Sequence, residues 1–385
     1  MKKYKVLHAP TTVGGNPQGQ SNALAECGVD SVSMTFSQNY FNYPSDRVLW
    51  RNKDSLLVKE CKRFFSFVKS FFEFDVFHFN SGQSFFGPFI ISEIPPSLHK
   101  NYLRLLRIAI RTRVFPYVQL VELKLYRLFS KPIFMTYQGS DARQGDYSLE
   151  NFAITVATQV DSNFYTAFSD EQKRHSISLF SRHCDQIYSL NPDLLWVLPP
   201  SAKFLPYSHI SLDEWQPMYT QLHSGPLRIA HAPTHRQAKG TDFVLAAAES
   251  LKKQGYDIEL LLVEGLSNSE AKKVYASADI LVDQLFAGWY GGLAVEAMAL
   301  GKPVVVYIRS QDLQFIPNEM QLDLPFLQAT SENLEGVLRH VVEMPRHELL
   351  EIAYRSRRYV EKWHNPEKIA QQLKRDYEDA LERSR

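Results

Sequence analysis

Two basic side chains in the loop Pro233–Gly240 are spaced to bind a phosphate group. The residues before this loop, Leu227–Ala232, read as a buried strand, and the loop then carries Arg236 and Lys239 directly before a helical pattern. Arginine offers a planar fork of donors and lysine a point charge, so the pair at a helix start would suit a diphosphate. An Arg-x-x-Lys spacing alone is more often two solvated surface cations, but the position behind a strand favours a binding site.

A second cluster lies at the start of the predicted helix Ala294–Leu300. Gly291 and Gly292 expose backbone amides there, so a pyrophosphate could approach the backbone without intervening side chains. Glu296 follows within one turn, and its carboxylate could accept both hydroxyl groups of a ribose. The alternative is a glutamate that only complements the positive end of the helix dipole.

The N-terminal residues show the same order of strand, glycine loop and helix. Lys5–Ala9 reads as a strand, Gly14 and Gly15 lie in the loop behind it, and Ser21 would cap the helix that follows. Such a loop directs helix amides at an anion. His78, near the end of another predicted strand, could contact a donor or an acceptor, or it could be a buried histidine with satisfied hydrogen bonds.

These segments together resemble the GT-B glycosyltransferases, and specifically the GT4-like group that retains the anomeric configuration. The loop HAPTHRQAKG resembles the diphosphate loop of that group. The stretch GWYGGLAVEAMALGKPVV resembles its donor motif, in which a Glu is followed after seven residues by a second Glu. HAPTTVGGNPQGQS near the N-terminus and TYQGSDAR at Thr136–Arg143 extend the resemblance to most of the chain.

The resemblance implies a role for each candidate residue. Arg236 and Lys239 would bind the donor diphosphate and stabilise it as the leaving group, and Glu296 would hold the ribose. Asp141, on the N-terminal wall of the cleft, joins the two cations as a candidate catalytic residue. The other donor-side residues that it indicates are Gly14, Gly15, Gln284, Tyr290, Gly291 and Gly292, and the acceptor-side candidates are Asn16, His78, Gln138 and Asp141.

Two positions depart from the family pattern. The first Glu of the donor motif would fall at Gly288, and Asp283, Gln284 or Tyr290 could substitute for it. Gln138 stands where relatives commonly have a His, and an amide can bond a sugar hydroxyl but carries no proton at neutral pH. A catalytically impaired GT-B protein that binds nucleotide or glycan, and a GT-B sugar-nucleotide 2-epimerase, therefore remain alternative interpretations.

The reaction implied by the resemblance is transfer of a sugar, with retention, from a UDP- or GDP-linked donor to a glycan or lipid-linked glycan. It would belong to cell-surface polysaccharide or glycolipid biosynthesis. No protein nucleophile is needed, because the diphosphate leaves and positioned donors neutralise its growing charge. We expect no metal and no further cofactor, since the sequence has no Asp-x-Asp pair in a donor-like context and no cluster of metal ligands.

Two sheets are needed to position these residues. Strand patterns alternate with helical patterns, which indicates parallel sheets with helices on their faces. The predicted strands are Lys5–Ala9, Asp75–Phe79, Pro132–Tyr137, Gln186–Leu190, Leu227–Ala232, Ile258–Val263, Asp279–Asp283 and Pro303–Ile308. We expect an α/β protein with two doubly wound Rossmann-like domains facing across a cleft. Their bounds would be an acceptor-side domain over 1–206, a linker over 207–226, a nucleotide-sugar domain over 227–355 and a C-terminal helix over 356–385 that packs back towards the first domain.

The composition excludes several other classes of protein. The chain has 385 residues with a formal net charge of +1, which provides no field for gripping nucleic acid. Its three cysteines lie far apart without a Cys-x-x-Cys pair, which is typical of reduced thiols in a cytoplasmic protein. No apolar stretch is long enough to span a membrane.

A basic segment over residues 100–131 bears on where in the cell the protein acts. It holds eight basic residues and a single acid, Glu122, and Arg104, Arg107 and Arg111 share one helical face. A basic helix with an apolar side can lie on an anionic membrane surface. The alternative is a core helix with a solvated basic face. The first interpretation predicts a cytoplasmic protein in peripheral contact with the inner face of the plasma membrane.

Overall fold

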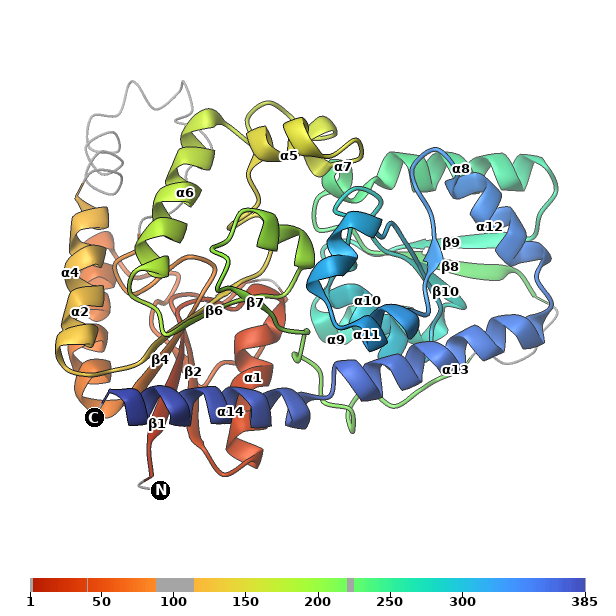
Figure 1. Cartoon of the computed structure of the whole chain (residues 1–385). Coiled ribbons are helices and arrows are strands. Elements are labelled where there is room, and N and C mark those ends of the chain that lie inside the picture. The colour runs from red at the N-terminus through yellow and green to blue at the C-terminus, as the bar shows by residue number, and fades with distance from the viewer. Residues whose placement is uncertain (1–2, 40, 88–113, 220–224, 385) are drawn as a thin grey trace.

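The computed structural model describes residues 3–39, 41–87, 114–219 and 225–384, which form two α/β lobes side by side (Figure 1). Each lobe is built on one parallel sheet with helices on both faces. The chain leaves the first lobe after β7 (Lys203–Phe204) and returns to it through α13 (Arg346–Trp363) and α14 (Pro366–Arg383). The predicted pair of doubly wound domains is confirmed.

The first lobe has seven parallel strands in the order β3-β2-β1-β4-β5-β6-β7. The strand order reverses between β1 and β4, and ligands of such sheets bind beyond the carboxyl ends at that point. The strands before β7 are β1 (Lys5–Ala9), β2 (Asp30–Thr35), β3 (Arg47–Val48), β4 (Val76–Asn80), β5 (Ile133–Tyr137) and β6 (Gln186–Ser189). In this lobe, the predicted strands correspond to β1, β4, β5 and β6, whereas β2, β3 and β7 were not predicted.

Helices cover both faces of this sheet, so consecutive strand residues alternate between two cores. Val6 and Val76 pack on the face covered by α1 and α14, whereas Leu7 and Phe77 pack on the face covered by α2, α4 and α6. The helices are η1 (Val13–Gly15), α1 (Asn16–Glu26), α2 (Leu56–Glu73), α4 (Phe115–Leu128), α5 (Gly145–Asn151), η3 (Val156–Thr158), α6 (Ala167–Ser181) and η4 (Pro192–Trp196).

The second lobe has five parallel strands in the order β12-β11-β10-β8-β9. These are β8 (Leu227–His231), β9 (Ile258–Leu262), β10 (Ile280–Val282), β11 (Val304–Val306) and β12 (Leu327–Gln328). One face packs on α8 and α12, and the other on α9, α10 and α13. The helices before α13 are α7 (Arg236–Lys239), α8 (Thr241–Lys253), α9 (Asn268–Ser277), α10 (Gly292–Ala299), η5 (Ser310–Phe315), α11 (Asn318–Leu322) and α12 (Leu334–Glu343).

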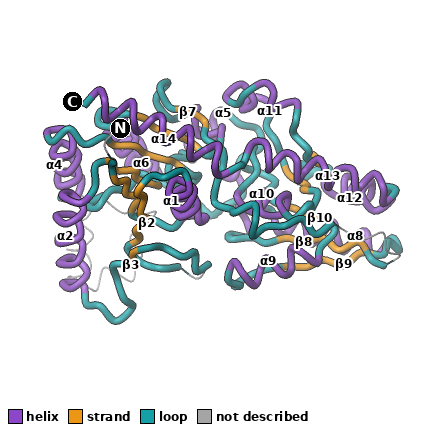
Figure 2. Tube along the Cα trace, turned by 90° about the horizontal axis from the view of Figure 1, so that it is seen from below, coloured by secondary structure: helices purple, strands orange, loops and turns teal. Residues whose placement is uncertain are grey.

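The C-terminal helix α14 lies against α1 and the first-lobe sheet, while α13 runs beside the second lobe (Figures 1 and 2). Tyr377 of α14 is fully buried, and its hydroxyl lies 2.6 Å from His78 Nδ1 on β4. Tyr188 of β6 donates to the carboxylate of Asp376 at 2.5 Å. The last helix of the chain is therefore part of the first lobe's core.

The first α-helix of the N-terminal half starts earlier than predicted. The helix expected to start at Ser21 begins at Asn16, because Gly15 adopts a left-handed conformation (φ 69°) at its N-cap and Pro17 fits its first turn. The expected basic face of Arg104, Arg107 and Arg111 lies outside the described residues. Within the described ranges, no helix combines the length and apolar character needed to cross a bilayer.

Candidate functional site

A cleft of about 350 Å³ lies between the lobes, where the carboxyl ends of both sheets meet. The first lobe contributes the loops after β1 and β5, including Gly14 and Gln138. The second lobe contributes the loops after β8, β9 and β10 together with the start of α10. The linker that follows β7 contributes Tyr207 and His209 to the cleft wall. Both lobes must therefore be present for this site to exist.

Lys239 is the cation that the second lobe contributes to this cleft, and Arg143 of the first lobe also lines it. It ends α7, and its Nζ lies 2.9 Å from Asp283 Oδ1 and 2.8 Å from Gln284 Oε1. Asp283 is fully buried and also accepts the backbone N–H of Gly291 at 2.7 Å. A Cβ built on Gly291 would lie 3.4 Å from Lys239 Nζ, so the ammonium sits beside the turn that opens α10. The first two amides of α10, those of Gly292 and Leu293, have no backbone acceptor in the ranges that the structure describes, whereas the amides of Ala294 and Val295 donate to Gly291 O. An anion placed at this helix start would contact the two free amides and the ammonium together.

Arg236 is one turn earlier and is not among the residues that line the cleft, although its partner Glu264 is. His235 caps α7 by accepting the N–H of Ala238, which fixes where the guanidinium emerges. Arg236 forms a bidentate pair with Glu264, at 2.8 Å from Nε to Oε1 and 2.6 Å from Nη2 to Oε2. The guanidinium lowers the pKa of Glu264. Glu264 lines the cleft. For Arg236 to contact a ligand there, the guanidinium must therefore give up at least one of its two hydrogen bonds to this carboxylate.

Glu296 brings the two lobes together. Its Oε1 accepts from Asn268 Nδ2 at 2.8 Å and from the hydroxyl of Tyr43, in the first lobe, at 3.4 Å. Burial and the charge of Glu296 raise the pKa of Tyr43 well above its usual value, so the hydroxyl stays a donor. The Tyr43 ring in turn lies against Gly15, where a Cβ would come within 2.6 Å of it. The N-terminal glycine loop thus reaches Glu296 through Tyr43.

Gly288, the position of the missing first Glu, has no room for a side chain. Its φ is +80°, and a Cβ there would lie 2.7 Å from Arg309 Nη1 and 2.9 Å from Asp312 Oδ2. Arg309 pairs with Asp312 at 2.9 Å and donates to the Ile154 carbonyl of the first lobe at 2.8 Å. Burial raises the pKa of Asp312 to about 6. An ion pair that connects the lobes therefore occupies the space beside this glycine.

Replacing Gly288 by alanine should destabilise the protein. The left-handed backbone conformation alone costs an L-residue about 1–3 kcal/mol, and the added methyl group displaces Arg309. We expect a loss of at least that size in the free energy of unfolding, measured by urea titration. Gly336→Ala in α12 is the matched control, because nothing lies within 4 Å of its Cβ position and its φ is ordinary. Equal stability of Gly288→Ala and the wild type would contradict this account.

Known structures share this arrangement of lobes, although no protein-family model and no curated protein sequence matches the chain. Sucrose-phosphate synthase from Thermosynechococcus elongatus superposes with a TM-score of 0.61 and 14% identity, covering 99% of this chain and 100% of that one. The catalytic domain of starch synthase IV from Arabidopsis thaliana, bound to ADP and acarbose, gives 0.59 and 10%, covering 99% and 100%. An α-glucosyltransferase in complex with UDP and DNA gives 0.56 and 9%, covering 97% and 99%. This chain has the GT-B fold.

The GT-B cleft brings together most residues of the two predicted motifs. Lys239, Gln284 and Glu296 line it with their side chains, and Gly14, Gly291 and Gly292 line it with their backbone. Gln138 also lines it, and its amide donates to Asn80 Oδ1 at 3.3 Å. Within the described residues, no group of three or more His, Cys, Asp or Glu side chains is arranged to hold a metal ion.

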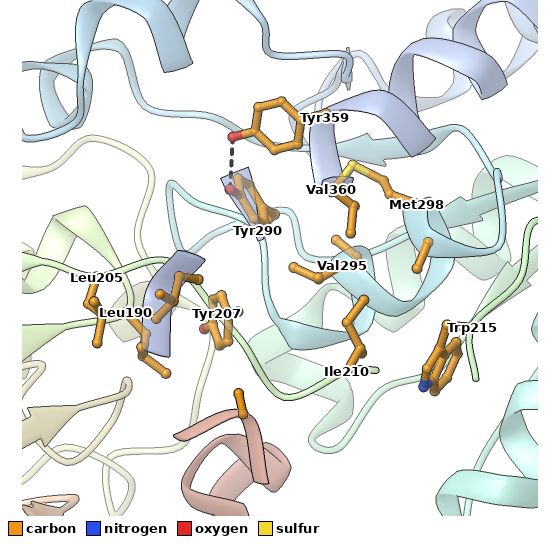
Figure 3. Close-up of a cluster of buried hydrophobic side chains, with 14 of the residues drawn as sticks. Leu190, Leu205, Tyr207, Ile210, Trp215, Tyr290, Val295, Met298, Tyr359 and Val360 are labelled. Atoms are coloured by element: carbon orange, nitrogen blue, oxygen red, sulfur yellow. Dashed lines mark hydrogen bonds between the residues drawn. The ribbon is translucent and has the colours of Figure 1, made fainter. Parts of the chain in front are cut away.

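Tyr290 and His78 do not reach the GT-B cleft, which corrects their assignment as ligand-binding residues. Tyr290 points into the core, where its hydroxyl lies 2.9 Å from that of Tyr359 (Figure 3). The same hydroxyl lies 2.8 Å from His364 Nε2. His78 is fully buried between Tyr377 and Thr136, whose Oγ1 lies 2.7 Å from its Nε2. Burial lowers the pKa of His78 well below its usual value. Both side chains have structural partners.

Three further candidates support the loops and do not face the cleft. Asp141, expected to be catalytic, accepts the backbone N–H groups of Gln138 and Gly139, with a shortest distance of 2.6 Å, and so shapes the loop after β5. Asn16 is fully buried and accepts the N–H of Ser208 in the linker at 3.0 Å. Gly15 supports Tyr43, as described above. None of the three is among the residues that line the cleft, and the direct catalytic or ligand-binding roles expected for them stay predictions.

The cleft also contains residues that the sequence analysis did not single out. They are Tyr43, Arg143, His209 and Asn268. Arg143 belongs to the TYQGSDAR stretch, and its Nε donates to Asp193 Oδ2 at 2.7 Å. The other three come from a loop after β2, from the linker and from the start of α9. None of them belongs to a recognisable motif, so local patterns carry no signal for them.

Proposed function

We propose that this protein is a glycosyltransferase that moves a sugar from a nucleoside diphosphate to a hydroxyl group of a glycan or lipid-linked glycan. The observation that carries the proposal is the arrangement of Lys239, the start of α10 and Glu296 along one wall of the interlobe cleft. An ammonium beside helix amides suits a diphosphate. A carboxylate one turn further suits the hydroxyl groups of a ribose.

The reaction breaks the bond between the anomeric carbon and the diphosphate oxygen, and forms a bond from that carbon to the acceptor oxygen. Charge grows on the diphosphate as it leaves, and Lys239 and the α10 amides are placed to stabilise it. The acceptor hydroxyl loses its proton, which the departing phosphate can take. No residue of the described chain has to form a covalent bond with the sugar, and we propose retention without a metal ion.

The donor and the setting are proposed from the sequence motifs and from the acceptor class. A GT4-like, UDP- or GDP-linked specificity rests on the resemblance of the HAPTHRQAKG and donor motifs. The starch synthase and α-glucosyltransferase structures contain ADP and UDP, which supports a nucleoside diphosphate as the common ligand. A place in cytoplasmic synthesis of cell-surface polysaccharide or glycolipid follows from the proposed acceptor.

The test is to incubate the protein with UDP-, GDP- and ADP-sugars and to measure nucleotide release with and without glycan acceptors. We expect release that depends on an acceptor, together with a new glycan product identified by mass spectrometry. Tight nucleotide binding without turnover over a broad acceptor set would favour the catalytically impaired alternative, to which the Gly288 departure points. Conversion of the donor to an isomer without acceptor would identify an epimerase.

We also propose that the first lobe contacts an anionic membrane through α2 and α4, which lie side by side (Figures 1 and 2). Phe71 of α2 packs on Phe129, the residue that directly follows α4 in the sequence, with 5.2 Å between ring centroids. Beside this contact the two helices expose large apolar side chains at helical spacing. They are Leu57, Phe64, Phe65 and Phe72 on α2, and Tyr117, Val121 and Leu128 on α4. Such a patch on a monomer usually marks an interaction site.

The charges next to this apolar face indicate which kind of partner it would contact. Lys69 of α2 and Lys124 of α4 are exposed beside it, and Lys131 lies 5.4 Å from the centre of the Phe71 ring. Glu122, the acid of α4, is buried and accepts from Ser84 and the amides of Phe85 and Phe86, so it adds no exposed negative group. Basic and apolar side chains together suit an anionic bilayer surface.

Removing two of the exposed phenylalanines should weaken vesicle binding. Burying one such side chain contributes about 1.5–3 kcal/mol, so Phe65→Ser with Phe72→Ser should lower the partition coefficient by tenfold or more. The measurement is co-sedimentation with phosphatidylcholine vesicles containing phosphatidylglycerol. Leu322→Ser, which changes an equally exposed residue on α11 of the second lobe, is the control. Unchanged partitioning of the double variant would refute the membrane contact. Wild-type binding that is equally strong with and without phosphatidylglycerol would refute it as well.

A further inference from the structure

His209 is a buried imidazole on the cleft wall without a hydrogen-bond partner. It lies in the linker between the lobes, and its side chain is only 1% exposed. Neither ring nitrogen has a hydrogen-bond partner in the described part of the chain. Nε2 lies 3.4 Å from Glu296 Oε1, but the two atoms form no hydrogen bond. A buried polar group left unpaired is costly, so one that lines a cavity points to a ligand that completes it.

The backbone around His209 is held firmly in place. Ser208 N donates to Asn16 Oδ1 at 3.0 Å, and Tyr207 donates from its hydroxyl to Asn191 Oδ1 at 3.0 Å. The linker also passes so close to α1 that a Cβ at Gly19 would lie 2.5 Å from His209 Cα. These contacts come from α1 and from the loop after β6, so the first lobe fixes the position from which the imidazole enters the cleft.

The His209 ring lies beside Glu296 and the start of α10, the two groups that we propose bind the ribose and the diphosphate of the donor. A Cβ at Gly292 would come within 3.2 Å of His209 Cε1 and 3.4 Å of Nε2, so this edge of the ring faces the first residue of α10. Glu296 lies beside Nε2 one turn further along the same helix. A nucleotide with its ribose at Glu296 and its phosphates at the helix start would pass directly in front of the imidazole.

We propose that His209 is a donor-binding residue that donates a ring N–H hydrogen bond to the diphosphate of the nucleotide sugar. This rests on the proposed glycosyltransferase function. An imidazole carries at least one N–H in every protonation state, whereas phosphate oxygens only accept, so the two groups are complementary. The bond also connects the linker to the ligand, because His209 belongs to the segment that joins the lobes.

Isothermal titration calorimetry tests the proposal with a series of ligands of one base. UDP, GDP and ADP are first compared on the wild-type protein, and the tightest of them is then used with its monophosphate and its nucleoside. We expect His209→Leu to weaken diphosphate binding about 10- to 100-fold, the range for a hydrogen bond to a charged group. The affinity for the nucleoside should change by less than twofold, and His209→Gln should recover most of the loss.

Two further variants keep the test decisive. His364→Gln is the matched control, because His364, at the end of α13, is an equally buried histidine that contacts the same linker, and its nitrogens already lie 2.8 Å from Tyr207 O and from Tyr290 Oη. Its diphosphate affinity should equal that of the wild type. Should His209→Leu fail to fold, His209→Asn tests the same contact, because its amide ends short of the Nε2 position.

The outcomes separate this proposal from the proposed function. Diphosphate binding by His209→Leu as tight as by the wild type overturns the role of His209 alone. An equal loss for the nucleoside and the diphosphate overturns the phosphate contact and places the imidazole on the ribose. A wild-type protein that binds none of the three diphosphates overturns both this proposal and the glycosyltransferase function.

Discussion

Replacing Lys239 by alanine is expected to lower kcat/KM for sugar transfer by about 10²- to 10³-fold, the range for losing one positioned group that stabilises charge in the transition state. Its ammonium lies beside the turn that opens α10, where the proposed reaction would place the growing charge of the leaving diphosphate. Steady-state kinetics with a nucleotide sugar and an acceptor measure the loss. Arg236→Ala should have a smaller effect, because Arg236 is not among the residues that line the cleft and its guanidinium is already paired with Glu264.

The Lys239 experiment needs a control for folding. Removing the ammonium leaves the buried Asp283 carboxylate without its partner, and a buried unpaired charge costs about 3–5 kcal/mol. The double variant Lys239→Met with Asp283→Asn removes that charge and should regain stability without regaining activity. Lys253→Ala, which removes an equal charge at the exposed end of α8, should behave like the wild type. Normal kinetics in Lys239→Ala would remove this lysine from the site.

The second large effect is expected at Glu296. Replacing it by alanine should weaken nucleoside diphosphate binding about 10- to 100-fold, because hydrogen bonds from ribose to a charged acceptor are lost. The residue is almost fully buried and is already aimed by Asn268 at 2.8 Å, so little ordering is needed when a ligand binds. Calorimetry with a ribonucleoside diphosphate and its 2′-deoxy analogue measures both affinities.

The deoxy analogue makes the Glu296 assignment specific. The wild type should prefer the ribonucleotide, whereas Glu296→Ala should bind the two ligands equally. Glu296→Gln keeps the shape but offers a single acceptor oxygen, so it should retain part of the preference. A Glu296→Ala protein that still discriminates between the two ligands would show that the ribose lies elsewhere.

Local patterns were sufficient to predict most of the sheets. Strands such as Val304–Val306 are continuous apolar runs because both faces of the sheet are covered. β2, with the sequence DSVSMT, escaped prediction because serine and threonine interrupt its run. Its Ser33 makes two hydrogen bonds, of 2.7 Å each, to Asp46, which directly precedes the neighbouring strand β3, and the pattern of β2 itself does not reveal this partner.

The site was predicted as far as its residues lie in contiguous motifs. Lys239, Gly291 and Glu296 belong to two short stretches of the second lobe, and they do line the cleft. Tyr290, in one of the same stretches, has its direction set by Tyr359 and His364, about 70 residues later in the chain. Tyr43 and His209 approach Glu296 only after both lobes have folded, so their place depends on tertiary structure alone.

The docking of α14 on the first lobe has a consequence for synthesis on the ribosome. His78 and Phe134 of the first-lobe sheet are covered by Tyr377, so this face stays open in the nascent chain until residues 366–383 have left the exit tunnel. We expect a fragment ending near residue 206 to expose the part of this apolar sheet face that α14 covers, and to aggregate more readily than the full chain.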